Sequence, residues 1–214
     1  MSVLPGKGLY AITDCENLDT DTLVDKTMKI LDAGAAMLQY RNKSDNQELK
    51  QEQARLLHGL CNKYHVPFII NDDLELARKL DADGVHLGIN DMNCKKARIL
   101  LGPDRIIGIS CYNDLDRAIL MQDAGASYIA FGSFFPTQTR ANTVKAELKV
   151  IKTAKQKLKL PLVAIGGITP ANGKILLDAG ADFLAVVSGI YNSKDTISTT
   201  RDYIKLFNQE NPES

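Results

Sequence analysis

The sequence predicts an α/β fold, a (β/α)8 (TIM) barrel, with residues 1–214 in one domain. Eight short apolar runs alternate with amphipathic stretches along nearly the whole chain. Most of these runs do not alternate between apolar and polar residues, as expected for parallel strands buried on both faces. A four-residue motif also recurs just before several of the runs. An open, doubly wound sheet is the runner-up, although that fold seldom needs eight similar units.

The predicted strands are rich in β-branched and aromatic residues, which favour extended structure. In chain order they span residues 8–13, 36–40, 67–71, 84–87, 106–110, 128–132, 162–165 and 183–187. Between them, apolar residues at helical spacing predict helices over 22–31, 46–64, 74–80, 113–122, 144–158 and 170–177. The polar tail, residues 208–214, is expected to fray.

The recurring motif is Asp-Ala-Gly-Ala, at residues 32–35, 123–126 and 178–181, with a looser copy at 81–84. Its glycine suits the left-handed position that ends many helices. We therefore interpret the motif as structural, and we expect it at the end of the barrel opposite the chemistry.

Composition excludes several classes of function. The formal net charge is zero, so no broad nucleic-acid or membrane-binding face is expected. The four cysteines are scattered without a CxxC pair, which favours reduced thiols over a disulfide scaffold or a zinc site. The first residues do not resemble a signal peptide, and no apolar run approaches the roughly 20 residues of a membrane helix. We expect a cytoplasmic protein with small-molecule partners; a homo-oligomer is left open.

Two aspartates follow neighbouring predicted strands, Asp72 after 67–71 and Asp91 after 84–87. The carboxyl ends of barrel strands share one edge, so the two carboxylates should converge there and repel each other. Such a pair near the cations Arg41, Lys43 and Arg140 suits Mg²⁺ carrying a polyphosphate. The alternative is that each aspartate only caps the helix that follows it.

Small residues follow the last two predicted strands, Gly166-Gly167 and Ser188-Gly189. Barrels often bind a phosphate at these loops, through backbone N–H groups. The alternative is a pair of tight turns without a ligand. The polar loop that begins with residues 137–140 is interpreted as a lid that closes over an anion. The alternative is a solvent-exposed surface loop without that role.

The histidines and Cys111 carry weaker signals. His86 is expected to be a buried, hydrogen-bonded core residue rather than a ligand, and His58 and His65 are expected on helix surfaces. Cys111 should lie near the site, but no residue is apparent that would activate its thiol.

Between residues 9 and 190 the segments LYAITD, LQYRNK, IIND, DGVHLGIND, IGIS, FGSFFPTQTR, AIGGI and VVS occur in this order. This ordered set resembles the thiamine phosphate synthase family. The resemblance implies a (β/α)8 barrel that is a Mg²⁺-dependent transferase. Its implied reaction joins hydroxymethylpyrimidine diphosphate to a thiazole phosphate, or to the carboxylated form of that thiazole, and releases diphosphate.

The resemblance also implies roles for individual residues. Asp72 and Asp91 would hold Mg²⁺, Gln39 would read the aminopyrimidine, and Ser110 would lie near the reacting carbon. Arg41, Lys43 and Asn71 would grip the diphosphate, and Arg140 would cover the leaving group. The implied catalytic residues are Arg41, Lys43, Ser110 and Arg140. Tyr40 and Asn42 would complete the pyrimidine diphosphate site. The implied contacts to the thiazole phosphate are Thr137, Gln138, Thr139, Gly167, Val187 and Ser188.

Some positions depart from the family pattern. Arg140 replaces the usual Lys, which keeps the charge but changes the geometry. Tyr40 replaces a usual Leu. The implied reaction passes through a pyrimidine cation and needs no protein nucleophile. A thiazole tautomerase-like relative and a catalytically silent precursor-binding barrel are the alternatives, and the intact set of acids and cations argues against both.

Overall fold

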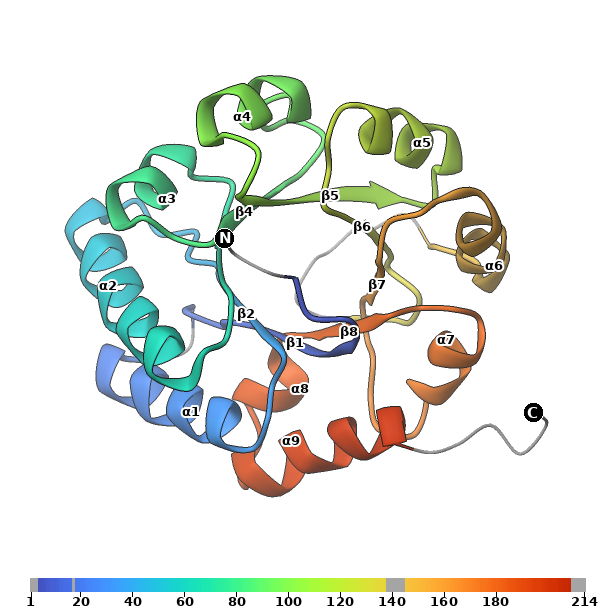
Figure 1. Cartoon of the computed structure of the whole chain (residues 1–214). Helices are drawn as coiled ribbons and strands as arrows, with labels where there is room; N and C mark the ends of the chain where they lie inside the picture. Colours follow the sequence, from blue (N-terminus) through green and yellow to red (C-terminus); the bar gives the residue numbers. More distant parts are fainter. Residues whose placement is uncertain (1–3, 17, 138–144, 209–214) are drawn as a thin grey trace.

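The computed structural model describes residues 4–16, 18–137 and 145–208, and these form a closed barrel of eight parallel strands in chain order (Figure 1). The (β/α)8 prediction is therefore confirmed. All eight predicted strands are present. They are β1 Gly8–Ile12, β2 Met37–Tyr40, β3 Phe68–Asn71, β4 Gly84–Leu87, β5 Ile106–Tyr112, β6 Tyr128–Phe131, β7 Leu162–Ile165 and β8 Phe183–Val186.

Helices surround the barrel and pack on the outer face of its strands (Figure 1). They are α1 Thr20–Asp32, α2 Gln47–Tyr64, α3 Leu74–Leu80, α4 Cys94–Leu101, α5 Leu115–Asp123, α6 Leu148–Lys157, α7 Lys174–Asp178, α8 Ser188–Tyr191 and α9 Thr196–Lys205, followed by the 3-10 helix η1 Leu206–Asn208. Because Asn208 belongs to η1, the expected fraying does not begin there; residues 209–214 lie outside the described part of the chain. No helix in the described residues is long and apolar enough to cross a membrane.

The predicted helices differ from the observed ones mainly at the C-terminal half of the chain. The helix expected at 170–177 is shortened to α7, because Asn172 accepts a hydrogen bond from the backbone of Thr169 and holds a turn there. Helix α9 was not predicted, since its threonines are poor helix formers. Asp195 caps it, and burial of Thr200 and Tyr203 stabilises it. Helices α4 and α8 were not predicted either.

The glycines of the repeated motif end their helices as expected. Gly34, Gly125 and Gly180 have φ angles of 103°, 93° and 109°, which a side chain would disfavour. In the looser copy, Asp81 takes this left-handed role with a φ of 55°. These turns precede strands β2, β4, β6 and β8, so they lie at the end of the barrel where strands begin.

Apolar side chains form two layers, one between the strands and the helices and one inside the barrel. The parallel register places Tyr10 opposite Met37 and Ile12 opposite Gln39, so alternate residues of each strand point inward. The interior is filled by Tyr10, Ile12, Met37, Ile69, Ile106, Tyr128, Ala130, Val163, Phe183 and Ala185. Polar residues continue this inward series toward the carboxyl ends of the strands, and there the pocket opens.

Candidate active site

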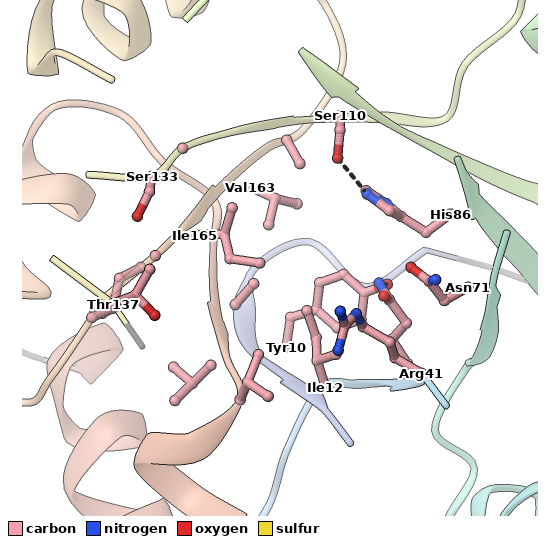
Figure 2. Close-up of a pocket in the computed structure, with 18 of the residues that line it drawn as sticks. Tyr10, Ile12, Arg41, Asn71, His86, Ser110, Ser133, Thr137, Val163 and Ile165 are labelled. Atoms are coloured by element: carbon pink, nitrogen blue, oxygen red, sulfur yellow. Dashed lines mark hydrogen bonds between the residues drawn. The ribbon is translucent and has the colours of Figure 1, made fainter. Parts of the chain in front are cut away.

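A pocket lies at the carboxyl ends of the barrel strands, and all eight strands or the loops after them line it (Figure 2). Its apolar wall is formed by Ile12, Ala130, Val163, Ile165 and Ala185. Nine of the residues implied by the sequence also line it, namely Gln39, Arg41, Asn71, Asp72, Ser110, Thr137, Gly167, Val187 and Ser188. The structure therefore gathers residues that are up to 149 positions apart in the chain (39 to 188) around one cavity.

Asp72 and Asp91 converge at the edge of this pocket, within hydrogen-bonding reach of each other. Neither of them caps a helix: Asp73 caps α3 and Asn93 caps α4. The capping alternative is therefore excluded for both. Asp91 instead turns back and accepts a hydrogen bond of 2.6 Å from the backbone of Gly88.

The backbone of Asp72 is left-handed, with a φ of 61°. This conformation is uncommon outside glycine and is best tolerated by Asn and Asp. The backbone N–H of Asp72 donates to the carbonyl of His86 on the neighbouring strand, at 2.9 Å. Its carboxylate accepts from Asn71 Nδ2 at 2.7 Å and from the Lys43 ammonium. Local strain, strand pairing and side-chain contacts thus hold this carboxylate at the pocket edge.

The two acids have pKa values shifted in opposite directions. Burial raises the pKa of Asp72, but hydrogen bonds with Lys43 and Asp91 outweigh it, so the net pKa is lowered. Burial and the hydrogen bond with Asp72 both raise the pKa of Asp91. Two neighbouring carboxylates repel each other when both are ionised, and a bound cation would relieve that repulsion. In the described parts of the chain, no group of three or more His, Cys, Asp or Glu side chains could hold a metal ion.

The two described cations occupy different surroundings. Arg41 lines the pocket, and its side chain is only 18% exposed. The Thr13 hydroxyl accepts a hydrogen bond from the backbone N–H of Arg41 at 2.8 Å and donates one to the Arg41 carbonyl at 3.1 Å. These two bonds connect the ends of β1 and β2. Lys43 lies farther out, paired with Asp72. Of the two, Lys43 contacts the acidic pair, whereas the acid that Arg41 approaches is Glu16, at 4.0 Å.

Tyr40 and Asn42 do not line the pocket, contrary to the roles implied for them. Tyr40 lies in the outer apolar layer because consecutive residues of a strand face opposite sides, and Gln39 faces inward. Its hydroxyl donates to Gln53 Oε1 at 3.0 Å, and Asn42 Nδ2 donates to the same atom at 2.9 Å. Both side chains thus attach the loop after β2 to helix α2, and we leave them out of the substrate contacts.

The glycines after β7 are required by packing. Gly166 and Gly167 have φ angles of 104° and 62°. A Cβ on Gly166 would lie 1.9 Å from Ser133 Oγ, and one on Gly167 would lie 2.3 Å from the carbonyl oxygen of Pro136. Close packing against the loop after β6 thus explains both glycines without a ligand. Thr137 lines the same pocket, and so does Ser188, the first residue of α8.

Three of the implied residues, Gln138, Thr139 and Arg140, lie outside the described residues, and so does the rest of the expected lid, to about residue 142.

His86 is buried and hydrogen-bonded, as expected, but it also lines the pocket, which the sequence analysis missed. Its Nε2 lies 2.9 Å from Ser110 Oγ (Figure 2), and its Nδ1 lies 2.9 Å from the Tyr128 hydroxyl. Tyr128 in turn lies 2.8 Å from the Tyr10 hydroxyl, which accepts from Gln39 Nε2 at 2.7 Å. Alternation along β4 was the available signal, because Val85 and Leu87 face outward and the residue between them must face inward.

Other polar pocket residues that the sequence analysis missed are Tyr10 and Tyr112. Cys111 points into the outer apolar layer rather than the pocket, and burial raises the pKa of its thiol to about 12. The thiol is therefore not activated. His65 ends α2 in a left-handed conformation, and His58 is half-buried with its ring stacked on Phe68.

Comparison with known proteins gives one consistent result. Residues 9–190 match the thiamine monophosphate synthase family. A thiamine-phosphate synthase from Thiobacillus denitrificans is 44% identical over 210 residues, which cover 98% of this chain and 99% of the relative. Another, from Xylella fastidiosa strain 9a5c, is 46% identical over 202 residues, covering 94% of this chain and 85% of the relative.

A solved structure agrees with these relatives. The thiamine phosphate pyrophosphorylase from Pyrococcus furiosus superposes with a TM-score of 0.84 at 32% identity, covering 95% of this chain and 96% of that one. Family match, sequence identity and fold extend over the barrel and the pocket together, and this chain belongs to the thiamine monophosphate synthase family.

Proposed function

We propose that this chain joins 4-amino-2-methyl-5-hydroxymethylpyrimidine diphosphate to 4-methyl-5-hydroxyethylthiazole phosphate, or to its carboxylated form, and releases diphosphate. Its family makes it a transferase of thiamine biosynthesis. The observation that carries the proposal is the pair Asp72 and Asp91 at the mouth of a pocket that has an apolar wall, with Lys43 paired to Asp72 and Arg41 among the lining residues. Such a mouth suits the diphosphate end of a substrate whose organic ring lies deeper in the barrel.

Mg²⁺ is the cofactor that the acidic pair fits. It binds through one or two carboxylates, keeps several waters and completes its shell with substrate phosphates. Burial and the neighbouring Asp72 raise the pKa of Asp91, and a bound cation would offset the cost of ionising it. A bound Mg²⁺ would supply charge neutralisation for the diphosphate leaving group.

The diphosphate contacts are proposed for Arg41, Lys43 and Asn71. Arg41 offers a planar fork of donors, which matches phosphate oxygens. Lys43 and Asn71 both contact Asp72 in the structure, and either can turn its donors to an arriving diphosphate. Arg140 is proposed as a further contact on the basis of the family resemblance alone.

The ring contacts are proposed for Gln39 and Ser110. Both line the pocket, and Gln39 is only 2% exposed, so its amide is desolvated and oriented before substrate arrives. A primary amide can accept from the exocyclic amino group and donate to the adjacent ring nitrogen. The proposed thiazole phosphate contacts in the described residues are Thr137, Gly167, Val187 and Ser188. Gln138 and Thr139 are proposed from the resemblance.

The proposed reaction is dissociative. The bond from the methylene carbon to the diphosphate oxygen breaks first, and its electron pair leaves with the diphosphate. The electron-rich aminopyrimidine stabilises the resulting cation, and the thiazole nitrogen then forms the new C–N bond. Arg41 and Lys43 stabilise the negative charge that develops on the leaving oxygen. The apolar wall limits the access of water, which would otherwise capture the cation.

The two alternatives lack support from any specific observation. A thiazole tautomerase would need an acid or base at the thiazole and no pair of metal-binding acids. A silent barrel would have no reason to keep Asp72 in a left-handed backbone at the pocket edge. We further propose a cytoplasmic location and small-molecule partners only, as the composition suggests; assembly into a homo-oligomer stays open.

The decisive experiment measures diphosphate release by the purified protein from hydroxymethylpyrimidine diphosphate. It is run with and without thiazole phosphate, and with Mg²⁺ or EDTA. We expect release to require both the thiazole phosphate and Mg²⁺. No release from folded protein under any of these conditions would overturn the proposed function, and release that persists in EDTA would overturn the metal's role.

A further inference from the structure

A chain of four hydrogen bonds crosses the interior of the barrel and connects two residues that line the pocket. It runs from Gln39 through Tyr10, Tyr128 and His86 to Ser110, with distances of 2.7, 2.8, 2.9 and 2.9 Å. The five residues come from five different strands, β2, β1, β6, β4 and β5. All except Ser110 are at most 9% exposed. A buried polar chain of this length needs every member satisfied, so its geometry is strongly constrained.

Gly108 makes space in the barrel for this chain of hydrogen bonds. Gly108 of β5 is paired with both His86 and Tyr128 in the strand register. A Cβ on Gly108 would lie 1.9 Å from Cζ of Tyr128. The ring of Tyr128 therefore extends over Gly108 toward β4, where it stacks on His86 with ring centres 5.7 Å apart. Without this glycine the hydroxyl of Tyr128 would not reach His86.

The chain has a direction that can be followed from donor to acceptor. Burial raises the pKa of both Tyr10 and Tyr128, so each phenol keeps one proton to donate. Gln39 Nε2 donates to Tyr10, so Tyr10 gives its proton to Tyr128, and Tyr128 gives its own to His86 Nδ1. An imidazole that accepts at Nδ1 carries its proton on Nε2, and it donates that proton to Ser110 Oγ.

Two atoms at the ends of the chain are then left for a ligand. Among the described residues, every buried side-chain nitrogen or oxygen has a hydrogen-bond partner. The amide oxygen of Gln39 makes no such bond there, so it must be accessible from the pocket that Gln39 lines. Ser110 accepts from His86 and keeps its own hydroxyl proton for the pocket. One end therefore presents an acceptor and the other a donor.

We propose that Tyr10, Tyr128 and His86 are positioning residues that set this direction, and that they thereby select a 4-aminopyrimidine over a 4-oxopyrimidine. The inference rests on the proposed function and extends it to specificity. An amino group donates to the Gln39 oxygen, whereas an oxo group would place two acceptors against each other. If a tyrosine hydroxyl is removed, the hydrogen-bond chain is broken. The amide of Gln39 can then rotate by half a turn and present its nitrogen to the oxo group instead.

The test measures binding rather than turnover, so that it does not depend on catalysis. Calorimetry in Mg²⁺ gives the Kd of hydroxymethylpyrimidine diphosphate and of its 4-oxo analogue. Wild-type protein should prefer the amino form by about 100-fold or more, since buried polar groups reject a mismatched partner strongly. In Tyr128→Phe this preference should fall at least about tenfold, roughly the effect of one or two lost hydrogen bonds. Tyr10→Phe should act in the same way.

Tyr191→Phe is the matched control. Tyr191 is also fully buried and its hydroxyl bonds to Thr27 at 2.9 Å, but it does not line the pocket. Losing this hydroxyl should leave the amino-to-oxo ratio within about twofold of wild type, a difference well below one hydrogen bond. An unchanged ratio in both folded Tyr128→Phe and folded Tyr10→Phe would overturn the proposal.

A second readout tests the direction of the chain without any ligand. Nitrogen NMR of ¹⁵N-histidine-labelled protein distinguishes the two neutral forms of His86 by which ring nitrogen carries the proton. We expect the proton on Nε2 in wild-type protein, and a proton on Nδ1 would overturn the proposal. Absence of diphosphate release in the earlier assay would count against the synthase reaction, whereas these two readouts bear on the positioning residues alone.

Discussion

Asp72→Asn isolates the charge of one proposed metal ligand with little change in shape. Asn tolerates the left-handed backbone found at this position, where φ is 61°. The amide oxygen of the new side chain can still accept from Asn71 Nδ2, which lies 2.7 Å from the present carboxylate. What is lost is one negative charge, and with it the ion pair to Lys43 and the repulsion on Asp91.

The expected effects on stability and activity differ greatly in size. The pair between Lys43 and Asp72 is partly exposed, at 43% and 28%, so its loss costs at most about 1 kcal/mol of unfolding free energy. That corresponds to about 2–4 °C in Tm for a domain of this size. Removing one charged contact from a transition state typically costs about 2.7–4 kcal/mol, or roughly 100- to 1,000-fold in rate. We therefore expect a folded protein with severely reduced turnover.

The assay follows diphosphate release across a Mg²⁺ titration, with Tm recorded on the same samples. Asp73→Asn is the matched control, since Asp73 is the next residue, caps α3 and does not line the pocket. Asn caps a helix about as well as Asp, so both activity and Tm should stay close to wild type. Wild-type kcat/KM for folded Asp72→Asn over the whole titration would refute the assignment of Asp72 to the metal.

Three further predictions concern other parts of the pocket. Ser188→Glu places a negative charge at the proposed thiazole phosphate site, so KM for the thiazole phosphate should rise at least about tenfold; an equal rise in KM for the pyrimidine diphosphate would contradict that placement. Gly166→Ala should destabilise the fold by about 2–5 kcal/mol, from backbone strain and a clash with Ser133. Gly102→Ala, with a φ of 80° and nothing within 4 Å, should cost less in a denaturation series, because only the strain remains. The pKa of Asp91 is higher in the folded than in the unfolded protein, so ionisation of Asp91 destabilises the fold at pH values above its folded pKa. At pH values below its unfolded pKa, Asp91 is protonated in both states and its charge has no effect on stability. In EDTA, Asp91→Asn should therefore raise Tm relative to wild type at pH 7 but not near pH 3, and equal shifts at both pH values would contradict the raised pKa.

Much of the barrel could be predicted because strand burial leaves a direct mark on composition. All eight strands are short apolar runs, and the glycines of the repeated motif adopt the left-handed angles that end a helix. Helices were harder to predict. The threonine-rich α9 has weak intrinsic preference, and packing against α1 and β1 stabilises it instead.

The proposed metal site was predictable as a location, but its alternatives were not distinguishable from sequence. Asp72 and Asp91 follow neighbouring strands, so parallel pairing had to bring them to one edge. Whether they cap helices depends on where the next helix begins. The helix caps are Asp73, one residue after Asp72, and Asn93, two residues after Asp91. Tyr40 was placed in the site by its neighbours in sequence, although strand alternation turns it outward.

The sequence by itself determined the fold class, the edge of the barrel that carries the chemistry, and the family to which the chain belongs. These follow from local patterns, because burial, turns and motifs are written in consecutive residues. Only the tertiary structure decided which polar groups meet inside the barrel. Tyr10, Tyr128 and His86 are each ordinary strand residues, yet the register and the space over Gly108 join them into one chain between Gln39 and Ser110. Hydrogen bonds between residues up to 118 positions apart depend on angles and distances that closure of the barrel alone sets.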